Sequence, residues 1–276
     1  MKNKLLHEVG KILEDLRVKK PLVHHLTNYV TVNDCANVTL AVGASPIMAD
    51  DIDEVESIAS ISSALVINIG TLNKRTIASM ITAGKKANEI NIPVVFDPVG
   101  AGASELRNKT TETLLKDVKM SVIRGNMSEI RFVAGLAAST KGVDASESDI
   151  ENSIEERRSI AEHVARKFGC IAAITGATDI VSDGERTLYL QNGTKLLSSV
   201  TGTGCMTTSL IASFCGASHN YLLSAAAGIL SMSIAGELAK ENSAAKGTGS
   251  FHIAIIDEIS KINDEVIEKR GNIYEV

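Results

Sequence analysis

The segment with the clearest chemical potential is a glycine-rich turn, Gly202-Thr203-Gly204-Cys205, which leads into an apolar helical pattern. Glycines let a backbone approach a ligand closely. The N–H groups of a first helical turn, together with the helix dipole, favour an anion. The spacing matches neither a Walker A loop nor the dinucleotide fingerprint. It predicts a phosphate-binding helix start, with an ordinary glycine turn capped by Thr203 as the alternative.

Cys205 stands at the start of this predicted helix. A thiol there is expected to have a pKa below its usual value of about 8.5, because the helix dipole favours the thiolate. It would then act as a base or a nucleophile, and the alternative is a small side chain that packs beneath a substrate. Burial as a small apolar residue is the ordinary state of all the cysteines, which form no CxxC pair and no zinc spacing.

Two acidic side chains follow buried strand patterns. Asp97 ends the run that begins at Ile92, and Glu129 follows the run that ends at Arg124. Ligands of open α/β sheets bind outside the carboxyl ends of the strands, so both acids are expected in one crevice. They could hold Mg²⁺ through water, since Mg²⁺ keeps several waters and takes one or two carboxylates plus phosphate oxygens. A helix cap or a surface acid is the alternative for each.

Strand-like and helical patterns alternate through the part of the chain that carries these residues. Apolar runs that end in polar or glycine-rich turns are predicted as strands at 65–69, 92–97, 121–124 and 171–175. Helical patterns lie between them at about 73–90, 104–117, 127–137 and 150–168. This alternation predicts a parallel sheet with helices on both faces. Continuous apolar runs are typical of strands that are buried on both sides.

The pattern changes after residue 178. Short strands joined by Asp183-Gly184 and Asn192-Gly193, which are hairpin signals, are predicted at 178–182, 186–190 and 196–200. From residue 203 onward the chain reads as helix only, at about 204–216, 219–240 and 250–269. An amphipathic helix precedes the series, with its apolar face between Leu5 and Leu16. No linker divides the chain, so we expect a single domain over residues 1–276, with the polar stretch Ser139–Glu156 as a surface excursion.

Two further polar segments have weaker signals. His24 and His25 are adjacent, and neighbouring strand positions point to opposite faces, so we do not expect a metal site there. Asn33 and Asn37 are spaced to share one helix face. The turn Lys246–Phe251 is rich in glycine and is expected to join two helices, with a role at the edge of a nucleotide or phosphate site as the alternative.

Composition excludes several classes of protein. The net charge is −5 and aromatic residues are 3 %, which argues against a nucleic-acid partner. The most apolar long stretch, Leu222–Ala235, contains serines and is shorter than the roughly 20 residues of a membrane span. The first twenty residues are charged throughout and lack the apolar core of a signal peptide. We therefore expect a cytoplasmic protein with reduced thiols and no membrane partner.

These segments together, and in this order, resemble the hydroxyethylthiazole kinase family of thiamine salvage over residues 20–265. The residues that carry the resemblance are Val23-His24, Thr27-Asn28, Asp97-Pro98-Val99-Gly100-Ala101-Gly102, Arg124-Gly125-Asn126, Ser128-Glu129, Gly202-Thr203-Gly204-Cys205, Lys246-Gly247 and Gly249-Ser250-Phe251. The resemblance implies an α/β, ribokinase-like fold. This fold has three α/β/α layers and a mostly parallel sheet with antiparallel edge strands.

The resemblance also implies an activity: ATP-dependent phosphorylation of the primary hydroxyl of 4-methyl-5-(2-hydroxyethyl)thiazole. It implies Mg²⁺ and a homotrimer with active sites at the subunit interfaces. The implied positions are Met48 and Gly202 on the thiazole, Asn28 and Val30 along the same pocket, Arg124 and Thr175 on ATP, Asp97 and Glu129 at the metal and phosphates, and Gly202–Cys205 as the anion hole.

Two positions depart from the wider pattern. Related kinases usually place Asp where Cys205 stands, and we interpret the thiol as a modest base at the substrate hydroxyl. Thr248 replaces a Pro of the family's late glycine turn, which should loosen that turn by less than about 1 kcal/mol. The alternative functions are a kinase for another small alcohol such as hydroxymethylpyrimidine or pyridoxal, a dehydratase on the same scaffold, and a binding protein without catalysis.

Overall fold

The structure, a computed structural model, describes residues 2–136, 147–242, 244 and 246–276. Its strands are β1 (Leu22–Leu26), β2 (Ser45–Met48), β3 (Ala64–Asn68), β4 (Val94–Asp97), β5 (Val122–Asn126), β6 (Ile171–Thr175), β7 (Asp179–Ser182), β8 (Thr187–Leu190) and β9 (Ile273–Glu275). They form a nine-stranded sheet in the order β2-β1-β3-β4-β5-β6-β7-β8-β9. The pairs from β2 to β6 are parallel and those from β6 to β9 are antiparallel, which confirms the predicted mixed sheet.

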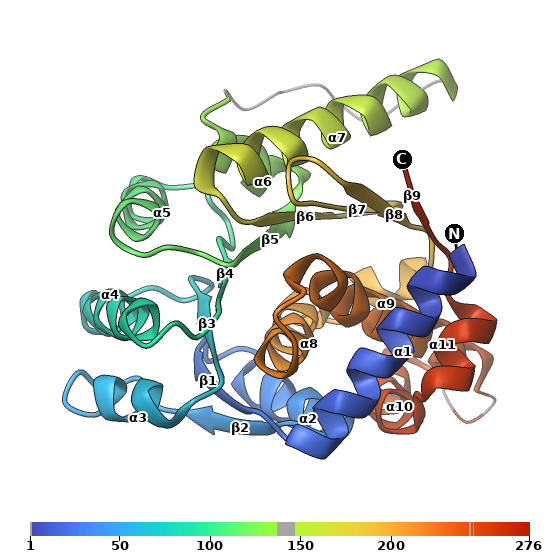
Figure 1. Cartoon of the computed structure of the whole chain (residues 1–276), viewed down its shortest axis with the longest axis horizontal. Coiled ribbons are helices and arrows are strands. Elements are labelled where there is room, and N and C mark those ends of the chain that lie inside the picture. Colours follow the sequence, from blue (N-terminus) through green and yellow to red (C-terminus); the bar gives the residue numbers. More distant parts are fainter. Residues whose placement is uncertain (1, 137–146, 243, 245) are drawn as a thin grey trace.

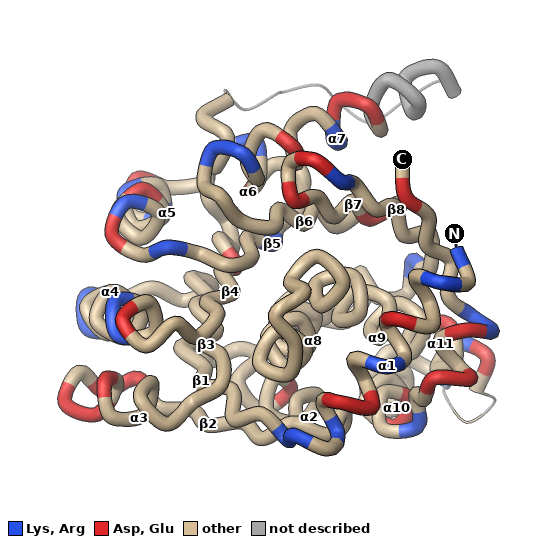
Figure 2. The backbone as a smooth tube through the Cα atoms, viewed as in Figure 1, with Lys and Arg blue, Asp and Glu red and all other residues tan. Residues whose placement is uncertain are grey.

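Helices cover both faces of this sheet (Figure 1). One face packs against α3 (Val55–Ile61), α4 (Lys74–Glu89), α5 (Glu105–Asp117), α6 (Met127–Ala134) and α7 (Glu147–Phe168). The other packs against α1 (Lys2–Lys19), α2 (Val32–Val42), α8 (Thr203–Ala217), α9 (Tyr221–Glu241), α10 (Thr248–Lys261) and α11 (Asp264–Arg270). The predicted three α/β/α layers are therefore confirmed. Charged residues lie mainly on the outer helices, and α8 has none (Figure 2).

The continuous apolar character of the strands follows from this two-sided burial. In β3, Ala64 and Val66 belong to the core under α8, whereas Leu65 and Ile67 belong to the core under α4. All of these side chains are at most 1 % exposed. Because successive strand residues point to opposite faces, a strand between two helical layers needs apolar residues at every position.

Several predicted boundaries are wrong. The segment predicted as a strand at 196–200 is a 3₁₀ helix, Lys195–Ser199, that begins where the Thr194 side chain accepts a hydrogen bond from the Leu196 N–H. The strand that pairs with β8 is instead β9, near the carboxyl terminus, so the region after residue 203 is not helix only. Pairing across such a distance leaves no local sequence signal.

Two predicted helices end earlier than expected. The helix predicted to reach residue 137 stops at Ala134, because Gly135 adopts a left-handed φ of 84° and closes the turn. The helix predicted at 250–269 is two helices, and the Asn263 side chain caps the second by accepting from the Val266 N–H at 2.9 Å. Of the predicted surface excursion, residues 139–146 lie outside the described residues, and α7 begins at Glu147.

Helix α9 is the one helix among the described residues that is long and apolar enough to cross a membrane. Its 21 residues exceed the apolar stretch recognised in the sequence, but 89 % of its most apolar window is buried inside the protein. It packs against α8 and α10 in the core of one face (Figure 1). This burial is typical of a core helix in a globular protein.

Candidate active site

Polar residues end four neighbouring strands at one edge of the sheet. Asn68 at the end of β3 pairs in register with Asp97 at the end of β4. Asn126 at the end of β5 pairs in register with Thr175 at the end of β6. Parallel strands present their carboxyl ends together, so the predicted assembly of these strand-end turns along one edge is confirmed.

The glycine turn lies over this edge and begins α8. Gly202 is the N-cap and has a left-handed φ of 88°, which favours glycine. A Cβ there would also lie 2.5 Å from Cγ2 of Thr31, so the turn has room only for glycine. The Thr203 hydroxyl donates to the Leu197 carbonyl at 3.1 Å, so the alternative of a Thr203 cap is wrong. No side chain caps α8, and its first N–H groups remain available to an anion.

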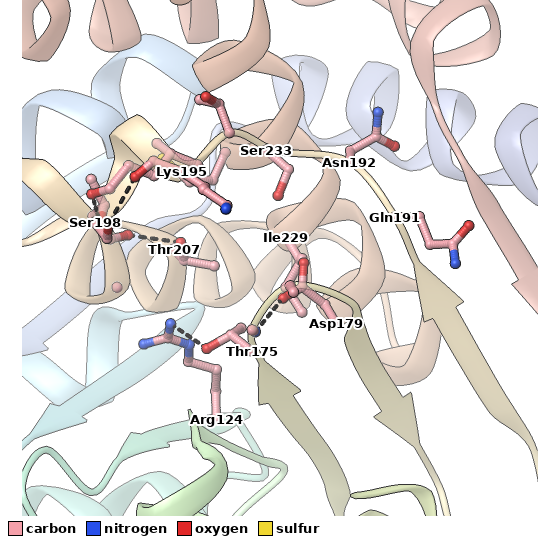
Figure 3. Close-up of a pocket in the computed structure, with 18 residues that line it drawn as sticks. Arg124, Thr175, Asp179, Gln191, Asn192, Lys195, Ser198, Thr207, Ile229 and Ser233 are labelled. Carbon is pink, nitrogen blue, oxygen red and sulfur yellow. Dashed lines mark hydrogen bonds between the residues drawn. The ribbon is translucent and has the colours of Figure 1, made fainter. Parts of the chain in front are cut away.

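Two cavities meet at this helix start. The first, here named the Cys205 cavity, has a volume of about 380 Å³ and is lined by Asn28, Asp97, Glu129, Gly202 and Cys205 among others. The second, named the Lys195 cavity, has a volume of about 570 Å³ and is lined by Thr175, Asp179, Lys195, Thr203 and Ser233 among others (Figure 3). Arg124 and Gly204 line both cavities. A group bound at this junction can pass from a ligand in one cavity to a ligand in the other.

Arg124 is held at the junction by neighbours on both sides. Its Nη2 donates to Oγ1 of Thr175 at 2.7 Å, as Figure 3 shows, and its Nη1 lies 3.6 Å from Oδ2 of Asp97. A guanidinium presents several N–H donors in a fixed plane, so donors remain for a phosphate beyond these two contacts. Arg124 and Thr175, both expected on ATP, thus contact each other at the wall of the Lys195 cavity.

Replacing Gly204 by alanine should disturb this junction without harming the helix. A Cβ at Gly204 would lie 2.8 Å from Nη1 of Arg124, so the guanidinium must shift from its place at the junction. We expect Gly204→Ala to lower kcat/KM by at least about tenfold, with an unchanged melting temperature because alanine favours helix. The matched control is Gly249→Ala, since Gly249 is also the second residue of a helix but has open space around it. Equal activity of the two variants would contradict the prediction.

One carboxylate oxygen of Asp97 accepts hydrogen bonds, and the other accepts none from the described residues. Its Oδ2 accepts hydrogen bonds from Nδ2 of Asn68 at 2.9 Å and from Oγ1 of Thr208 at 2.8 Å. Its Oδ1 is buried and has no hydrogen-bond partner among the described residues. Burial raises the pKa of Asp97 to about 6, against the attraction of Arg124 and with a further increase from Glu129. A buried acceptor without a partner is rare in folded proteins and points to a bound proton donor or cation.

The Glu129 side chain is hydrogen-bonded to the loop that follows Asp97. Its Oε1 accepts from the Gly100 N–H and its Oε2 accepts from the Asn126 N–H, both at 2.8 Å. The second contact completes the capping box of α6, in which the Asn126 side chain accepts from the Glu129 N–H. Capping, the alternative weighed for this acid, is therefore observed. Glu129 also lines the Cys205 cavity, and its oxygens keep lone pairs for a water or a cation.

The thiol of Cys205 does not have the expected electrostatics. Burial raises the pKa of Cys205, and the nearby Asp97 carboxylate raises it further, so the prediction of a lowered pKa is wrong. The helix dipole is a modest effect of partial charges, whereas burial and a neighbouring carboxylate both disfavour a thiolate. Hydrogen bonds to Sγ from Nδ2 of Asn28 and Nδ2 of Asn68, each at 3.3 Å, oppose this increase only in part.

The remaining predicted residues divide between the cavity and its surroundings. Asn28 is buried and Val30 is 55 % exposed, and both line the Cys205 cavity together with Gly202. Met48, at the end of the edge strand β2, does not line this cavity.

Other polar segments are explained by the fold. His24 and His25 lie on β1, where their rings contact the backbone carbonyls of Ala49 and Val23. Burial lowers the pKa of His25 to about 4, so it is neutral near pH 7. The Lys246–Phe251 turn starts α10 and lines neither cavity. The cysteines other than Cys205 are buried, as predicted, and none is in a disulfide.

A sequence model of the "Hydroxyethylthiazole kinase family" matches residues 13–265 of the chain. The chain belongs to this family. It is 63 % identical over 276 residues to a hydroxyethylthiazole kinase of Clostridium beijerinckii, with 100 % of both chains covered. It is 60 % identical to one from Ruminiclostridium cellulolyticum, with 98 % of both covered.

Solved structures agree with this family assignment. A hydroxyethylthiazole kinase protein from Pyrococcus horikoshii has 38 % identity and a TM-score of 0.88, with 98 % of this chain and 99 % of that chain covered. A Bacillus subtilis pyridoxal kinase in complex with ADP has a TM-score of 0.58 at 16 % identity, with 78 % of this chain and 90 % of that chain covered. At that identity the likeness shows the fold alone.

Several residues at the site of this family member were missed by sequence reasoning. Thr208 follows Gly204 by four positions. The helix predicted from residue 204 would therefore place both residues on the same helix face. Arg107 had no signal, because α5 reads as a surface helix. Its guanidinium donates to the backbone carbonyls of Ile69 at 2.6 Å and Gly70 at 2.7 Å, and also to that of Val99. It ties together two strand-end turns that border the Cys205 cavity.

Proposed function

We propose that the chain transfers the γ-phosphoryl group of ATP to the primary hydroxyl of 4-methyl-5-(2-hydroxyethyl)thiazole in thiamine salvage. The reaction is inferred from the family, and one structural observation supports where in the molecule it takes place. The Lys195 cavity and the Cys205 cavity share Arg124 and Gly204, at an uncapped helix start. Phosphoryl transfer needs a donor and an acceptor in line across a site that neutralises charge, and this junction has that form.

The two cavities divide the substrates between them. ATP occupies the Lys195 cavity, with its phosphates toward Arg124 and Thr175. The alcohol occupies the Cys205 cavity against Asn28, Val30 and Gly202. The first N–H groups of α8, from Thr203 to Cys205, form the anion hole for the group in transit. This division supports substrate roles for these residues and an ATP role for Arg124 and Thr175.

The acids at the junction fit a magnesium ion. Among the described residues no group of three or more His, Cys, Asp or Glu side chains could hold a metal. Mg²⁺ does not need such a cage, because it binds through one or two carboxylates, water and phosphate oxygens. Oδ1 of Asp97 would hold it directly and Glu129 would do so through water. When bound, the ion neutralises phosphate charge.

Cys205 contributes as a modest base at the substrate hydroxyl in this proposal. Its raised pKa leaves little thiolate near pH 7, so its contribution should lie at the low end of general-base catalysis. We expect Cys205→Ala to lower kcat by up to about 100-fold. The control is Cys170→Ala, a buried thiol that lines neither cavity. Turnover of Cys205→Ala within about twofold of wild type would contradict the base role and assign catalysis to the anion hole.

We also propose the assembly and the setting of the enzyme. Residues 1–276 form one domain, and three copies form a homotrimer with the alcohol site at the subunit interface. In one chain, Val30, which lines the Cys205 cavity, is 55 % exposed and its neighbour Tyr29 is 77 % exposed, whereas Met48 does not line this cavity. A neighbouring copy would cover such apolar residues. Light scattering after gel filtration tests the trimer. The enzyme acts in the cytoplasm on small molecules, with no nucleic-acid or membrane partner.

The decisive experiment is ADP release with Mg-ATP and a panel of alcohols: hydroxyethylthiazole, hydroxymethylpyrimidine, pyridoxal and ribose. Turnover confined to the thiazole supports the proposal. Turnover of another alcohol keeps the phosphate machinery and contradicts the substrate. Thermal stabilisation by thiazole without any turnover would favour a binding protein.

A further inference from the structure

The side chain of Asn68 is the centre of the hydrogen-bond network at the cavity junction. It ends β3 and is 1 % exposed. Its Oδ1 accepts from Nδ2 of Asn28 at 3.0 Å and from the Gly70 N–H at 2.9 Å. Its Nδ2 donates to Oδ2 of Asp97 at 2.9 Å and to Sγ of Cys205 at 3.3 Å. Both hydrogens and both lone pairs of the amide are thus committed.

We propose that Asn68 is a positioning residue for phosphoryl transfer, whose amide fixes the Asp97 carboxylate and the Cys205 thiol relative to each other. The inference rests on the proposed function and adds a residue to it. Asn68 does not line either cavity, so it would act through its two partners and not on a substrate.

The amide decides which carboxylate oxygen of Asp97 is free. Asn68 and Thr208 both donate to Oδ2, and this leaves Oδ1 without a partner among the described residues. With Asn68 removed, Thr208 is the one remaining hydrogen-bond donor to the carboxylate among the described residues, beside the ion pair with Arg124 at 3.6 Å. Rotation about the Cβ–Cγ bond would then bring either oxygen to Thr208 and Arg124, and the free acceptor would no longer have one defined position.

The same amide restricts Cys205. Sγ accepts N–H groups from both Asn68 and Asn28, so these two donors fix the sulfur from the side of β3 and β1. Asn28 is held by its bond to Asn68 and by the N–H and hydroxyl of Thr31, which donate to its Oδ1 at 3.2 and 3.1 Å. Loss of the Asn68 amide therefore removes one donor to the thiol and one of the three contacts that hold the other donor.

The test compares Asn68→Ala and Asn68→Asp with wild type in the ADP-release assay with thiazole. Both variants lose the two N–H donors, and Asn68→Asp keeps the oxygen that accepts from Asn28 and Gly70. Misplacement of a reacting group by about 1 Å can cost about 100-fold in rate. We expect kcat to fall about 100-fold in both variants, with the KM for thiazole within about threefold of wild type.

Asn88→Ala is the matched control. Asn88 also has its amide committed on both sides, to the backbone N–H and carbonyl of Lys119, but it lies at the end of α4 outside both cavities. Its loss should lower the melting temperature and leave kcat unchanged. A folded Asn68 variant that keeps kcat within about twofold of wild type would overturn the proposal.

A double-mutant cycle separates positioning from general damage. If Asn68 acts through its partners, Asn68→Ala should cost at least about threefold less in a Cys205→Ala background than in wild type, because residues in one network are not additive. Full additivity would contradict positioning of the thiol. The wild-type assay keeps the two proposals apart, since absence of wild-type turnover contradicts the function itself.

Discussion

Replacement of Arg124 by alanine is expected to lower kcat for thiazole phosphorylation by about 1,000-fold. A transition-state arginine contributes about 10³–10⁵ to phosphoryl transfer, because charge develops on the oxygens of the group in transit. Arg124 is the one cation that lines both cavities among the described residues. We expect the KM for ATP to rise as well, since the guanidinium would meet the phosphates in the ground state. Single-turnover and steady-state kinetics with both substrates varied would separate the two effects.

Arg124→Lys tests whether the rate depends on the charge of Arg124 or on the planar geometry of its guanidinium. Lysine keeps the charge but not the planar fork that bonds Thr175 on one side and leaves donors on the other. We expect the kcat of Arg124→Lys to exceed that of Arg124→Ala by less than about tenfold. Arg75→Ala is the control, since Arg75 is half-exposed and pairs with Asp50 away from both cavities. An Arg124→Ala enzyme that retains even a tenth of wild-type kcat would contradict the assigned role.

Local sequence signals were sufficient to predict which parts of the chain come together at this candidate site. Asp97, Arg124 and Thr175 each follow or end an apolar run, and parallel strands bring such ends to one edge of a sheet. The glycine turn before α8 needed only glycine conformations and a helix start to be recognised. These features depend on neighbouring residues in the chain, so periodicity and turn chemistry reveal them.

Tertiary contacts determine what the sequence could not predict. The helix dipole at Cys205 is a local effect, whereas burial and the Asp97 carboxylate that raise its pKa come from a fold with Asp97 more than one hundred residues away. In the same way, the pairing of β8 with β9 joins segments that no short-range rule connects. Asn68 was part of a recognised strand-end turn, but its links to Cys205 and Asn28 exist only after folding.

Asp97→Asn is expected to separate activity from stability. The substitution removes the charge of the carboxylate and changes little in shape, so the contacts from Asn68 and Thr208 can persist. Loss of the carboxylate that, in the proposed function, holds the metal should lower kcat by about 1,000-fold, because a catalytic metal contributes several kcal/mol to the transition state. A variant that is folded at the assay pH but has lower activity would show that the residue is needed for the reaction and not for the fold.

The pKa of Asp97 fixes the sign of the stability change. In the folded protein the pKa is raised from 3.8 to about 6, so the folded state binds this proton more tightly than the unfolded chain. The contribution to the free energy of unfolding is therefore present below about pH 4 and is lost as the pH rises to about 6. The Asn variant has no such proton. In EDTA, its melting temperature relative to wild type should rise between about pH 4 and about pH 6 and then stay level.

The opposite trend would show that Asp97 is stabilised as a carboxylate. Arg124 attracts this charge and two side chains donate to it, and these effects lower the pKa, whereas burial and Glu129 raise it. If the attraction prevailed, wild type would gain stability over the variant as the pH rises. The pH dependence of the melting difference thus decides whether the folded protein favours the protonated or the ionised form of Asp97.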